Sequence, residues 1–266
     1  MSKVILITGA SSGIGKAIAT YLHAKNYSVY GTSRNPDKVN LPFNMVALDV
    51  TDTKTIQAAI DRVIEKEGKI DVLINNAGKG ITGSIEDTPT DEMRANFNTN
   101  FFGVIDVAKA VLPQMRKQKS GTIINVTSIA GYMGLPFRGI YSASKGALEL
   151  VTEALSMEVK SFGIKVINVA PGDFATNIAS GRFHTPVYEG SAYKEKYTEN
   201  LALMDGHVNS GMDPKIMAKA ICQIIEKKNP NIHYKIGGFM EKFSVVLKRV
   251  LPDKVYEKLL MNHYKL

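Results

Sequence analysis

The sequence Val4-Ile5-Leu6-Ile7-Thr8-Gly9-Ala10-Ser11-Ser12-Gly13-Ile14-Gly15 organises the N-terminal half of the chain. Its apolar, β-branched beginning, residues 3–7, predicts a short buried strand. The residues from Lys16 to Leu22 then predict a helix. A glycine-rich turn between a strand and a helix lets a pyrophosphate approach the backbone N–H groups at the helix N-terminus.

This turn is predicted to be a cofactor loop formed by Gly9, Ser11, Ser12, Gly13, Ile14 and Gly15. Its spacing differs from the common G-x-G-x-x-G pattern, because Ile18 stands where that pattern has its last glycine. The alternative is a tight turn before an ordinary helix start. The strand–turn–helix setting favours the cofactor loop.

The end of the second predicted strand indicates which cofactor binds. This strand covers Ser28 to Thr32 and is followed by Ser33-Arg34-Asn35. An NAD site usually has an acidic residue here, which binds the ribose 2′-hydroxyl. Arg34 instead suits a 2′-phosphate, because a guanidinium can donate two parallel hydrogen bonds to it. The sequence therefore favours NADP(H) over NAD, with a surface arginine as the alternative.

Two further strands are predicted to end beside the nucleotide. Residues 45–48 lead into Asp49-Val50, where the aspartate either accepts from the adenine amino group or caps the helix near Thr53 to Glu67. Residues 72–75 lead into Asn76-Ala77-Gly78. Amide side chains can hold the backbone at this crossover, and the small residues after them leave room for the nucleotide.

Strands and helices continue to alternate through the middle of the chain. A helix from Thr90 carries Asn100, a poor helix-interior residue that indicates a kink. Strands follow at 122–126 and 165–169, and they end in Thr127-Ser128 and Pro171-Gly172. This alternation predicts an α/β fold, a doubly wound, mostly parallel sheet with helices on both faces, known as the Rossmann fold. Ligands of such sheets bind beyond the carboxyl ends of the strands, so the residues after the strands are expected to converge on the cofactor.

The helix that contains Tyr141 and Lys145 carries candidate acid–base residues. These two side chains are four residues apart and lie one turn apart on one helix face. A free phenol has a pKa of about 10 and is a poor proton donor at neutral pH. A fixed ammonium nearby favours the ionised phenol. An exposed helix pair is the alternative for these residues taken alone.

The same helix is predicted to run to about Phe162 with two apolar stripes. One stripe includes Leu150 and Met157, and the other includes Leu148 and Val159. Together they cover too wide an arc for one core face. We expect one face to meet the sheet and the other to meet a second subunit, which gives a homo-oligomer, a homodimer or a tetramer.

Taken together, the chain resembles the short-chain dehydrogenase/reductase family, in its single-domain branch. The resemblance covers residues 3–178 and a final strand near His233 to Ile236, which makes the sheet seven-stranded. Its elements follow in order along the chain: Thr8-Gly9-x-x-x-Gly13-x-Gly15, Asn75-Asn76-Ala77-Gly78, Asn100, Ser128, Tyr141-x-x-x-Lys145, Pro171-Gly172 and Thr176.

The resemblance implies hydride transfer between a nicotinamide and a carbonyl or alcohol. Tyr141 is then the proton donor or acceptor, and Lys145 assists it and holds the nicotinamide ribose. Ser128 hydrogen-bonds the reacting oxygen, and Asn100 anchors a water in a proton relay. Thr176 touches the nicotinamide carboxamide.

Two segments of the single domain, residues 1–266, go beyond the shared core. The first, residues 173–213, is predicted to be a lid over the substrate. Its aromatic and methionine side chains suggest a bulky apolar substrate, or they pack the lid on itself.

The second segment, residues 239–266, is a C-terminal helical extension with apolar residues at helical spacing and more basic than acidic residues. It is expected to be a helix pair that roofs the pocket with Phe239, Phe243 and Val246, or an interfacial helix at a membrane surface. Such tails resemble those of family members that act on steroids, retinoids or lipid ketones.

Composition is consistent with one large globular domain, since 44% of the 266 residues are hydrophobic and 22% are charged. The net charge of +8 is dispersed along the chain, which argues against nucleic acid. The single cysteine, Cys222, is predicted to be a core residue, so a reducing, cytoplasmic location is expected, with membrane contact at most peripheral. His184, His207 and His233 lack metal-ligand spacing.

The sequence therefore predicts an NADP(H)-dependent oxidoreductase that reduces the ketone, or oxidises the secondary alcohol, of a bulky hydrophobic substrate such as a steroid or a long-chain 3-keto lipid. One alternative is a non-catalytic NADP-binding sensor or scaffold, against which the intact Ser128, Tyr141 and Lys145 argue. Another is a peripheral membrane-binding protein.

Overall fold

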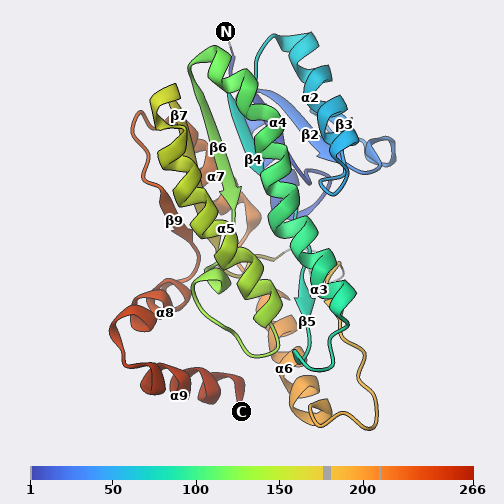
Figure 1. Cartoon of the computed structure of the whole chain (residues 1–266), viewed down its shortest axis with the longest axis vertical. Helices are drawn as coiled ribbons and strands as arrows, with labels where there is room; N and C mark the ends of the chain where they lie inside the picture. The colour runs from blue at the N-terminus through green and yellow to red at the C-terminus, as the bar shows by residue number, and fades with distance from the viewer. Residues whose placement is uncertain (1, 176–180, 210) are drawn as a thin grey trace.

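The computed structural model describes residues 2–175, 181–209 and 211–266. Seven parallel strands form one sheet in the order β3-β2-β1-β4-β6-β7-β9 (Figure 1). Their bounds are β1 Val4–Ile7, β2 Ser28–Ser33, β3 Asn44–Ala47, β4 Val72–Asn75, β6 Gly121–Val126, β7 Ile164–Pro171 and β9 His233–Ile236. The predicted doubly wound parallel sheet is confirmed, and its third strand begins one residue earlier than the sequence indicated.

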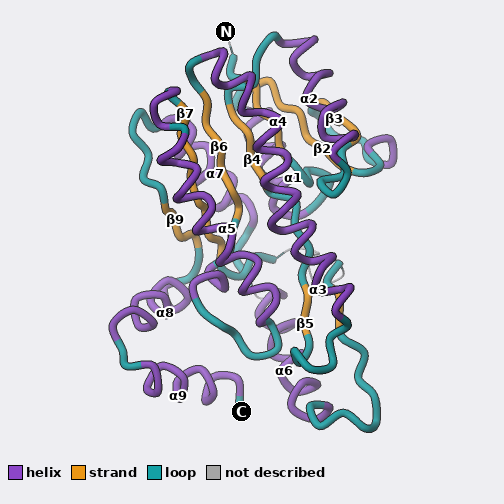
Figure 2. Tube along the Cα trace, viewed as in Figure 1, coloured by secondary structure: helices purple, strands orange, loops and turns teal. Residues whose placement is uncertain are grey.

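Helices cover both faces of this sheet. On one face lie α2 (Thr53–Glu67), α4 (Gly103–Gln118) and α5 (Gly139–Glu158), and on the other lie α1 (Gly13–Ala24) and α7 (Pro214–Glu226) (Figure 2). Strand β1 is apolar on both sides, so neighbours along it enter different cores. Leu6 packs with residues of α2 and α4, whereas Ile5 and Ile7 pack with residues of α1 and α7. Cys222 of α7 is buried, as predicted.

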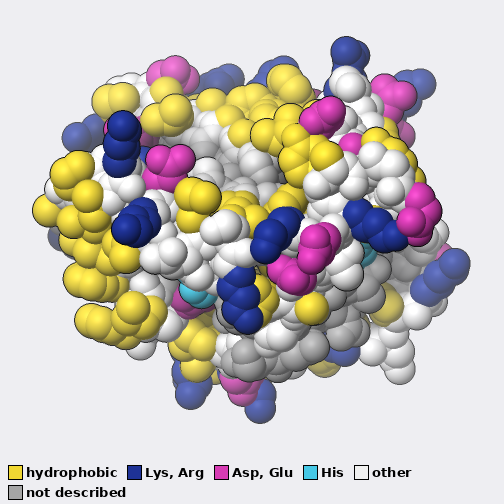
Figure 3. All heavy atoms as spheres, turned by 90° about the horizontal axis from the view of Figure 1, so that it is seen from below, with side chains coloured by type: hydrophobic (Ala, Val, Ile, Leu, Met, Phe, Trp, Pro, Cys, Tyr) yellow, Lys and Arg dark blue, Asp and Glu magenta, His cyan; other side chains and the backbone are white. Residues whose placement is uncertain are grey.

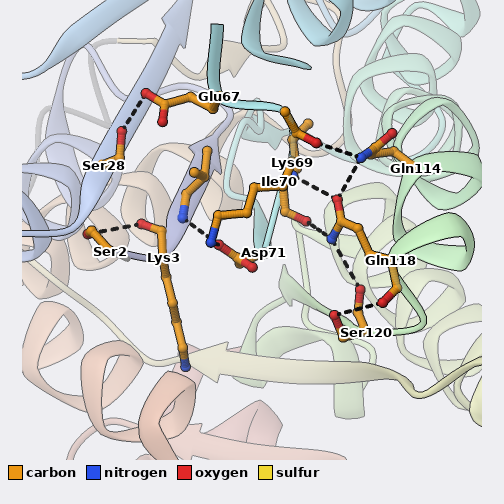
Figure 4. A network of polar contacts seen from close by, with 12 residues as sticks. Ser2, Lys3, Ser28, Glu67, Lys69, Ile70, Asp71, Gln114, Gln118 and Ser120 are labelled. Atoms are coloured by element: carbon orange, nitrogen blue, oxygen red, sulfur yellow. Dashed lines mark hydrogen bonds and ion pairs between the residues drawn. The ribbon is translucent and has the colours of Figure 1, made fainter. Parts of the chain in front are cut away.

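Polar contacts fix the edge of the sheet opposite the carboxyl ends of the strands (Figure 4). The side chain of Gln118 accepts from the N–H of Ile70 and donates to its carbonyl oxygen, both at 3.0 Å. The Asp71 carboxylate accepts from the N–H of Val4 at 2.8 Å and pairs with Lys69 at 2.8 Å. These bonds tie the starts of β1 and β4 to the end of α4.

Helix α5 has one buried and one exposed apolar stripe. The helix ends at Glu158, four residues before the predicted end. Leu148, and Val159 directly after the helix, are buried, whereas Leu150 and Met157 are 67% and 69% exposed. This agrees with the expectation that one face meets the sheet. A second subunit on the other face remains a prediction.

The predicted lid packs closely on the body of the molecule. Its strand β8 (Phe183–His184) pairs with β5 (Ile81–Thr82), and its helix α6 (Lys194–Asn209) places Tyr197 in the interior. The Tyr197 hydroxyl lies 2.9 Å from Thr82 Oγ1, and the Tyr193 hydroxyl donates to Glu86 at 2.7 Å. These two tyrosines therefore fasten residues 181–209 to the body of the molecule, whereas the alternative in the sequence analysis was that the segment packs on itself. Its action as a lid remains a prediction.

The C-terminal extension forms two helices, α8 (Phe239–Val250) and α9 (Asp253–Tyr264). They dock through Val245 and Tyr256, which pack in a third core cluster with Ile129 and Met133. Phe239, Phe243 and Val246 are 75%, 40% and 51% exposed. The expectation that these three side chains roof the pocket is therefore wrong, because the opposite side of α8 makes the contact with the body.

No helix among the described residues has the length and apolar character needed to cross a bilayer.

Candidate active site

A cleft of about 540 Å³ lies at the carboxyl ends of the strands. The residues predicted for the cofactor that line it are Gly9, Ser11, Ser12, Gly13, Ile14, Gly15, Arg34, Asp49, Val50, Asn76, Ala77, Gly78, Tyr141, Lys145 and Pro171. Gly172 lines a smaller pocket of about 70 Å³. Thr176 lies outside the described residues. Residues from separate strands thus meet at one edge of the sheet, as expected.

The loop before α1 leaves room for an anionic group. Gly9 and Gly13 have φ values of +67° and +53°, which side-chain-bearing residues rarely adopt. A Cβ atom on Gly15 would overlap the Gly9 carbonyl oxygen and the Asn76 amide. The Ser12 side chain makes no cap bond to the first turn of α1, so the N–H groups there can meet a ligand. These features fit the pyrophosphate of a dinucleotide.

The crossover after β4 is held as the sequence indicated. The Asn76 amide donates to the carbonyl oxygens of Thr8 and Gly9 at 3.1 and 3.0 Å. The Thr8 hydroxyl accepts from the N–H groups of Asn76 and Ala77, both at 3.0 Å. These four hydrogen bonds fix the backbone that forms the floor of the cleft beneath the glycine loop.

Arg34 and Asp49 lie at the end of the cleft that β2 and β3 form. Burial raises the pKa of Asp49, but hydrogen bonds from Thr51 and the charge of Arg34 outweigh it and lower that pKa. The N-cap of α2 is Asp52, which accepts from the N–H of Lys54 at 2.9 Å. Asp49 therefore does not cap this helix through its side chain. The buried Ser33 hydroxyl beside Arg34 has no hydrogen-bond partner within the described protein, which suits a bound nucleotide.

Tyr141 lies where the large cleft and the smaller pocket meet. It lines both the large cleft and the smaller pocket, whereas Lys145 lines the first and Ser128 lines the second. The Ser128 oxygen accepts from the N–H of Ala130 at 3.2 Å, which leaves its O–H able to donate. A group that reacts at Tyr141 can therefore reach a nucleotide on one side and a substrate on the other.

Lys145 is buried within α5. Its ammonium donates to the carbonyl oxygen of Val126 at 3.0 Å. Burial lowers the pKa of Lys145 to about 8, and the carboxylate of Glu149 opposes this shift. The proton on Lys145 is thus held loosely for a lysine, at a position beside the cleft.

Asn100 lies in a π-helical turn, Asn98–Phe102, between α3 (Thr90–Phe97) and α4, which confirms the predicted irregularity. Its side chain is buried and bonds both backbone groups of Lys79, accepting from N–H at 2.8 Å and donating to C=O at 2.9 Å. It therefore positions the backbone of Lys79, which lines the cleft. Its role in a water relay remains a prediction.

Two residues that the sequence analysis did not single out adjoin this site. The Arg138 guanidinium lies 5.4 Å from the centre of the Tyr141 ring and lines the smaller pocket. Glu149 is buried one helical turn after Lys145, where Thr127 donates to it at 2.5 Å. The spacing of Glu149 from Lys145 was a usable signal, because side chains four residues apart share a helix face. Arg138 offered no comparable pattern.

No cluster of three His, Cys, Asp or Glu side chains suited to a metal ion occurs in the part of the chain that the structure describes.

Comparisons with known proteins agree with this geometry. Residues 3–186 match the family described as short chain dehydrogenase. The chain is 41% identical over 263 residues to 3-ketodihydrosphingosine reductase of Bacteroides thetaiotaomicron, covering 98% of each protein. A short-chain dehydrogenase from Streptomyces avermitilis has a similar structure, with a TM-score of 0.83 and 32% identity over 100% of this chain and 96% of that one. The structure of ElxO with NADP bound gives a TM-score of 0.70 and 28% identity, covering 89% and 96%.

Proposed function

This chain belongs to the short chain dehydrogenase family, and we propose that it reduces the ketone of a long-chain 3-keto lipid with NADPH. The observation that carries the reaction is the position of Tyr141 in the lining of both compartments, with Lys145 on the cofactor side and Ser128 on the other. The oxidation of the corresponding secondary alcohol uses the same groups in reverse.

The preference for NADPH rests on Arg34. It lines the cleft at the end of β2, where a 2′-phosphate is expected, and its charge already acts on the neighbouring Asp49. A guanidinium can bind a phosphate through two charge-assisted hydrogen bonds. The structural relative ElxO holds NADP, which supports the same choice here.

The protein side of the reaction follows from three side chains. When bound, the reduced nicotinamide supplies the hydride that adds to the carbonyl carbon. Tyr141 gives its phenolic proton to the carbonyl oxygen, so that the product is an alcohol. Ser128 donates a hydrogen bond to that oxygen and stabilises the charge that develops on it. Lys145 contributes positive charge beside Tyr141 and can bind the sugar of the cofactor.

The substrate class rests on the smaller pocket and on the relative from Bacteroides. Ile81 and Phe174 give this pocket an apolar part. Its described lining also carries one carboxylate, Asp173, and two guanidinium groups, Arg138 and Arg182. An amino group next to the ketone, as in a 3-keto sphingoid base, would be recognised by a carboxylate. The relative's name, 3-ketodihydrosphingosine reductase, specifies that substrate for the relative. We therefore favour an amino-ketone lipid over a steroid.

The proposal is tested by NADPH oxidation with a panel of ketones. The panel contains a long-chain 3-keto sphingoid base, a 3-keto fatty acyl ester of the same chain length, a steroid ketone and a small soluble ketone, all supplied in detergent. We expect the highest kcat/KM with the sphingoid base and a secondary alcohol as the product by mass spectrometry. Equal rates on the steroid and the sphingoid base would contradict the assignment of substrate class.

A further inference from the structure

Helix α8 presents a continuous apolar stripe away from the body of the protein. Phe239, Phe243, Val246 and Val250 are spaced at i, i+4, i+7 and i+11, so they share one face of the helix. Each is at least 40% exposed, and Phe239 and Val250 are 75% and 73% exposed. The rings of Phe239 and Phe243 stack on each other at 5.6 Å. The buried residue of this helix, Val245, lies on the other side.

Helix α9 repeats the arrangement. Tyr256 and Tyr264 are buried, and the partly buried Leu260 lies between them on the inward face. Val255 and Leu259 are 48% and 46% exposed and lie on the outward face. The two helices therefore expose an apolar surface, which we call the tail surface: Phe239, Phe243, Val246, Val250, Val255 and Leu259.

Basic side chains border the tail surface. Lys242 and Arg249 are exposed along one side of the α8 stripe, seven residues apart, and Lys254 and Lys258 are exposed on α9. The tail acids are partly engaged elsewhere, since Glu241 bonds the backbone N–H of Asp173 and Asp253 pairs with Lys248. An apolar stripe with basic edges has the chemistry of a helix that lies in an anionic lipid interface. A second copy of this chain would bring its own basic residues against these.

The tail surface is fixed beside the mouth of the active site. The Glu241 carboxylate, in the first turn of α8, accepts from the N–H groups of Asp173 at 2.6 Å and of Gly238 at 2.5 Å. Burial raises the pKa of Tyr264 at the end of α9, while the charge of Arg138 opposes this shift and that of Asp173 adds to it, so these charged groups are near. Both Asp173 and Arg138 line the smaller pocket.

The view along the edge that holds the carboxyl ends of the strands shows hydrophobic side chains gathered on the left (Figure 3). This is the side on which α8 and α9 lie in Figure 1, and Lys and Arg side chains stand among them. Helices α8 and α9 therefore lie at the end of the molecule where the carboxyl ends of the strands are.

We propose that the tail surface docks this protein on an anionic lipid bilayer, with the mouth of the smaller pocket at the lipid interface. This inference rests on the proposed function, because a long-chain lipid ketone resides in a bilayer and not in water. Docking brings the pocket to the substrate, and a lipid needs only to rise partway out of the membrane to place its ketone at Tyr141. No helix inserts across the bilayer in this arrangement.

The test is co-sedimentation of the full-length protein with vesicles of phosphatidylcholine, alone or mixed with phosphatidylglycerol. We expect strong binding to the mixed vesicles and weaker binding as salt rises, because salt screens the basic residues. The double substitution Phe239→Ser and Phe243→Ser should weaken partitioning of the protein onto the mixed vesicles by about tenfold or more. The double charge reversal Lys242→Glu and Arg249→Glu should weaken binding at least about 25-fold, because each basic residue contributes about fivefold at an anionic surface.

Matched controls lie at the other end of the molecule. Met157 and Phe162 are 69% and 44% exposed, close to the 75% and 40% of Phe239 and Phe243. The double substitution Met157→Ser and Phe162→Ser should leave vesicle binding unchanged, because both side chains lie outside the tail surface. The exposed Lys109→Glu with Lys117→Glu on α4 is the control for charge. Equal loss of binding in these controls would overturn the proposal.

The readouts separate this inference from the proposed function. Binding is measured without substrate, and activity is measured on the same lipid ketone in detergent. Binding without any ketone reduction refutes the proposed function and leaves the docking in place. Reduction in detergent without vesicle binding refutes the docking. A third outcome is that the protein does not bind vesicles but self-associates as its concentration rises, and that the double substitution Phe239→Ser and Phe243→Ser abolishes this self-association. That outcome assigns the tail surface to a second copy of the chain and overturns the proposal.

Discussion

Glu149 Oε2 lies 3.1 Å from Nδ1 of His233, although the two residues are 84 positions apart in the sequence. The other ring nitrogen of His233 lies 3.0 Å from the carboxylate of Glu153. His233 continues a polar row across the sheet, since Asn75, Asn125 and Asn168 are successive register partners and Asn168 pairs with His233. The row faces α5, where Asn125 donates to Thr152 at 2.8 Å.

The contact between Glu149 and His233 links the surroundings of Lys145 on α5 to the last strand of the sheet, β9. Glu149 follows Lys145 by one helical turn, and its charge opposes the effect of burial on the pKa of Lys145. His233 on β9 and Thr127, directly after β6, hold the Glu149 side chain. We therefore propose that Glu149 is a positioning residue, which acts on the proposed reaction through Lys145.

We predict that Glu149→Gln moves the alkaline limb of the kcat/KM profile to lower pH. The carboxylate raises the pKa of Lys145, so its removal lets Lys145 lose its proton at a lower pH. The measurement is the pH dependence of ketone reduction from pH 6 to 10. Glu149→Asp should restore part of the shift. An unchanged alkaline limb, with activity lowered equally at every pH, would indicate a structural role alone.

Tyr141→Phe should lower kcat by about 10²–10⁴-fold, because the proton donor is lost. NADPH binding should stay nearly unchanged, since the ring remains and only the hydroxyl is removed. Steady-state kinetics and a fluorescence titration with NADPH measure the two quantities. Tyr188→Phe removes an exposed hydroxyl that donates to Asp87 and serves as the matched control. Retention of most of the turnover by Tyr141→Phe would refute the assigned mechanism.

Arg34→Asp should weaken NADPH binding and improve NADH binding relative to it. The new carboxylate repels a 2′-phosphate and can accept from a 2′-hydroxyl. Dissociation constants for both cofactors, measured by fluorescence titration, test this. Arg94→Asp, an exposed arginine on α3, is the control and should leave the NADPH/NADH ratio unchanged. The same unchanged ratio in Arg34→Asp would remove Arg34 from the cofactor site.

Gln118→Ala tests the edge of the sheet opposite the active site. Its side chain bonds both backbone groups of Ile70, so removal leaves a partly buried N–H and C=O without these partners. We expect a loss of about 1–3 kcal/mol in the free energy of unfolding, measured in urea, with kcat unchanged below the unfolding range. Gln57→Ala, on the exposed side of α2, should change stability little. A large loss of activity without a loss of stability would be unexpected.

Local patterns explain why the fold and most of the site could be predicted. The strand, the glycine turn and the helix from Val4 to Ala24 are consecutive in the chain, and each has its own signal in spacing and residue type. Tyr141 and Lys145 are likewise neighbours on one helix. The convergence of Arg34, Asn76 and Pro171 followed from the rule that parallel strands end at one edge.

Contacts that depend on tertiary packing could not be predicted. The partnership of Glu149 and His233 requires the register of β9 on β7, which the local sequence does not specify. The prediction that the C-terminal extension roofs the pocket was wrong for a related reason. Helix α8 has apolar residues on two sides, and its periodicity marks Phe239 and Phe243 as clearly as Val245. Packing against Ile129 decides which side is buried.

The last prediction concerns Lys145 and the stability of the protein without its cofactor. In the folded protein burial lowers the pKa of Lys145 from 10.5 to about 8, whereas the unfolded chain keeps the higher value. Between these two pH values the unfolded state binds more protons than the folded state, so the free energy of unfolding rises with pH. The contribution is fully present above the unfolded pKa and is lost as the pH falls to the folded one.

Lys145→Met removes this dependence, because methionine does not titrate. The difference in unfolding free energy between the unmodified protein and Lys145→Met should therefore change in favour of the unmodified protein as the pH rises from 8 to 10, by up to about 1.4 kcal/mol per pH unit. Urea unfolding at several pH values measures it. Lys109→Met, an exposed lysine on α4, should give a nearly constant difference. If the difference in unfolding free energy is constant with pH for Lys145→Met too, the prediction is wrong. Val126 and Glu149 would then stabilise the buried ammonium of Lys145 as much as water stabilises it in the unfolded chain.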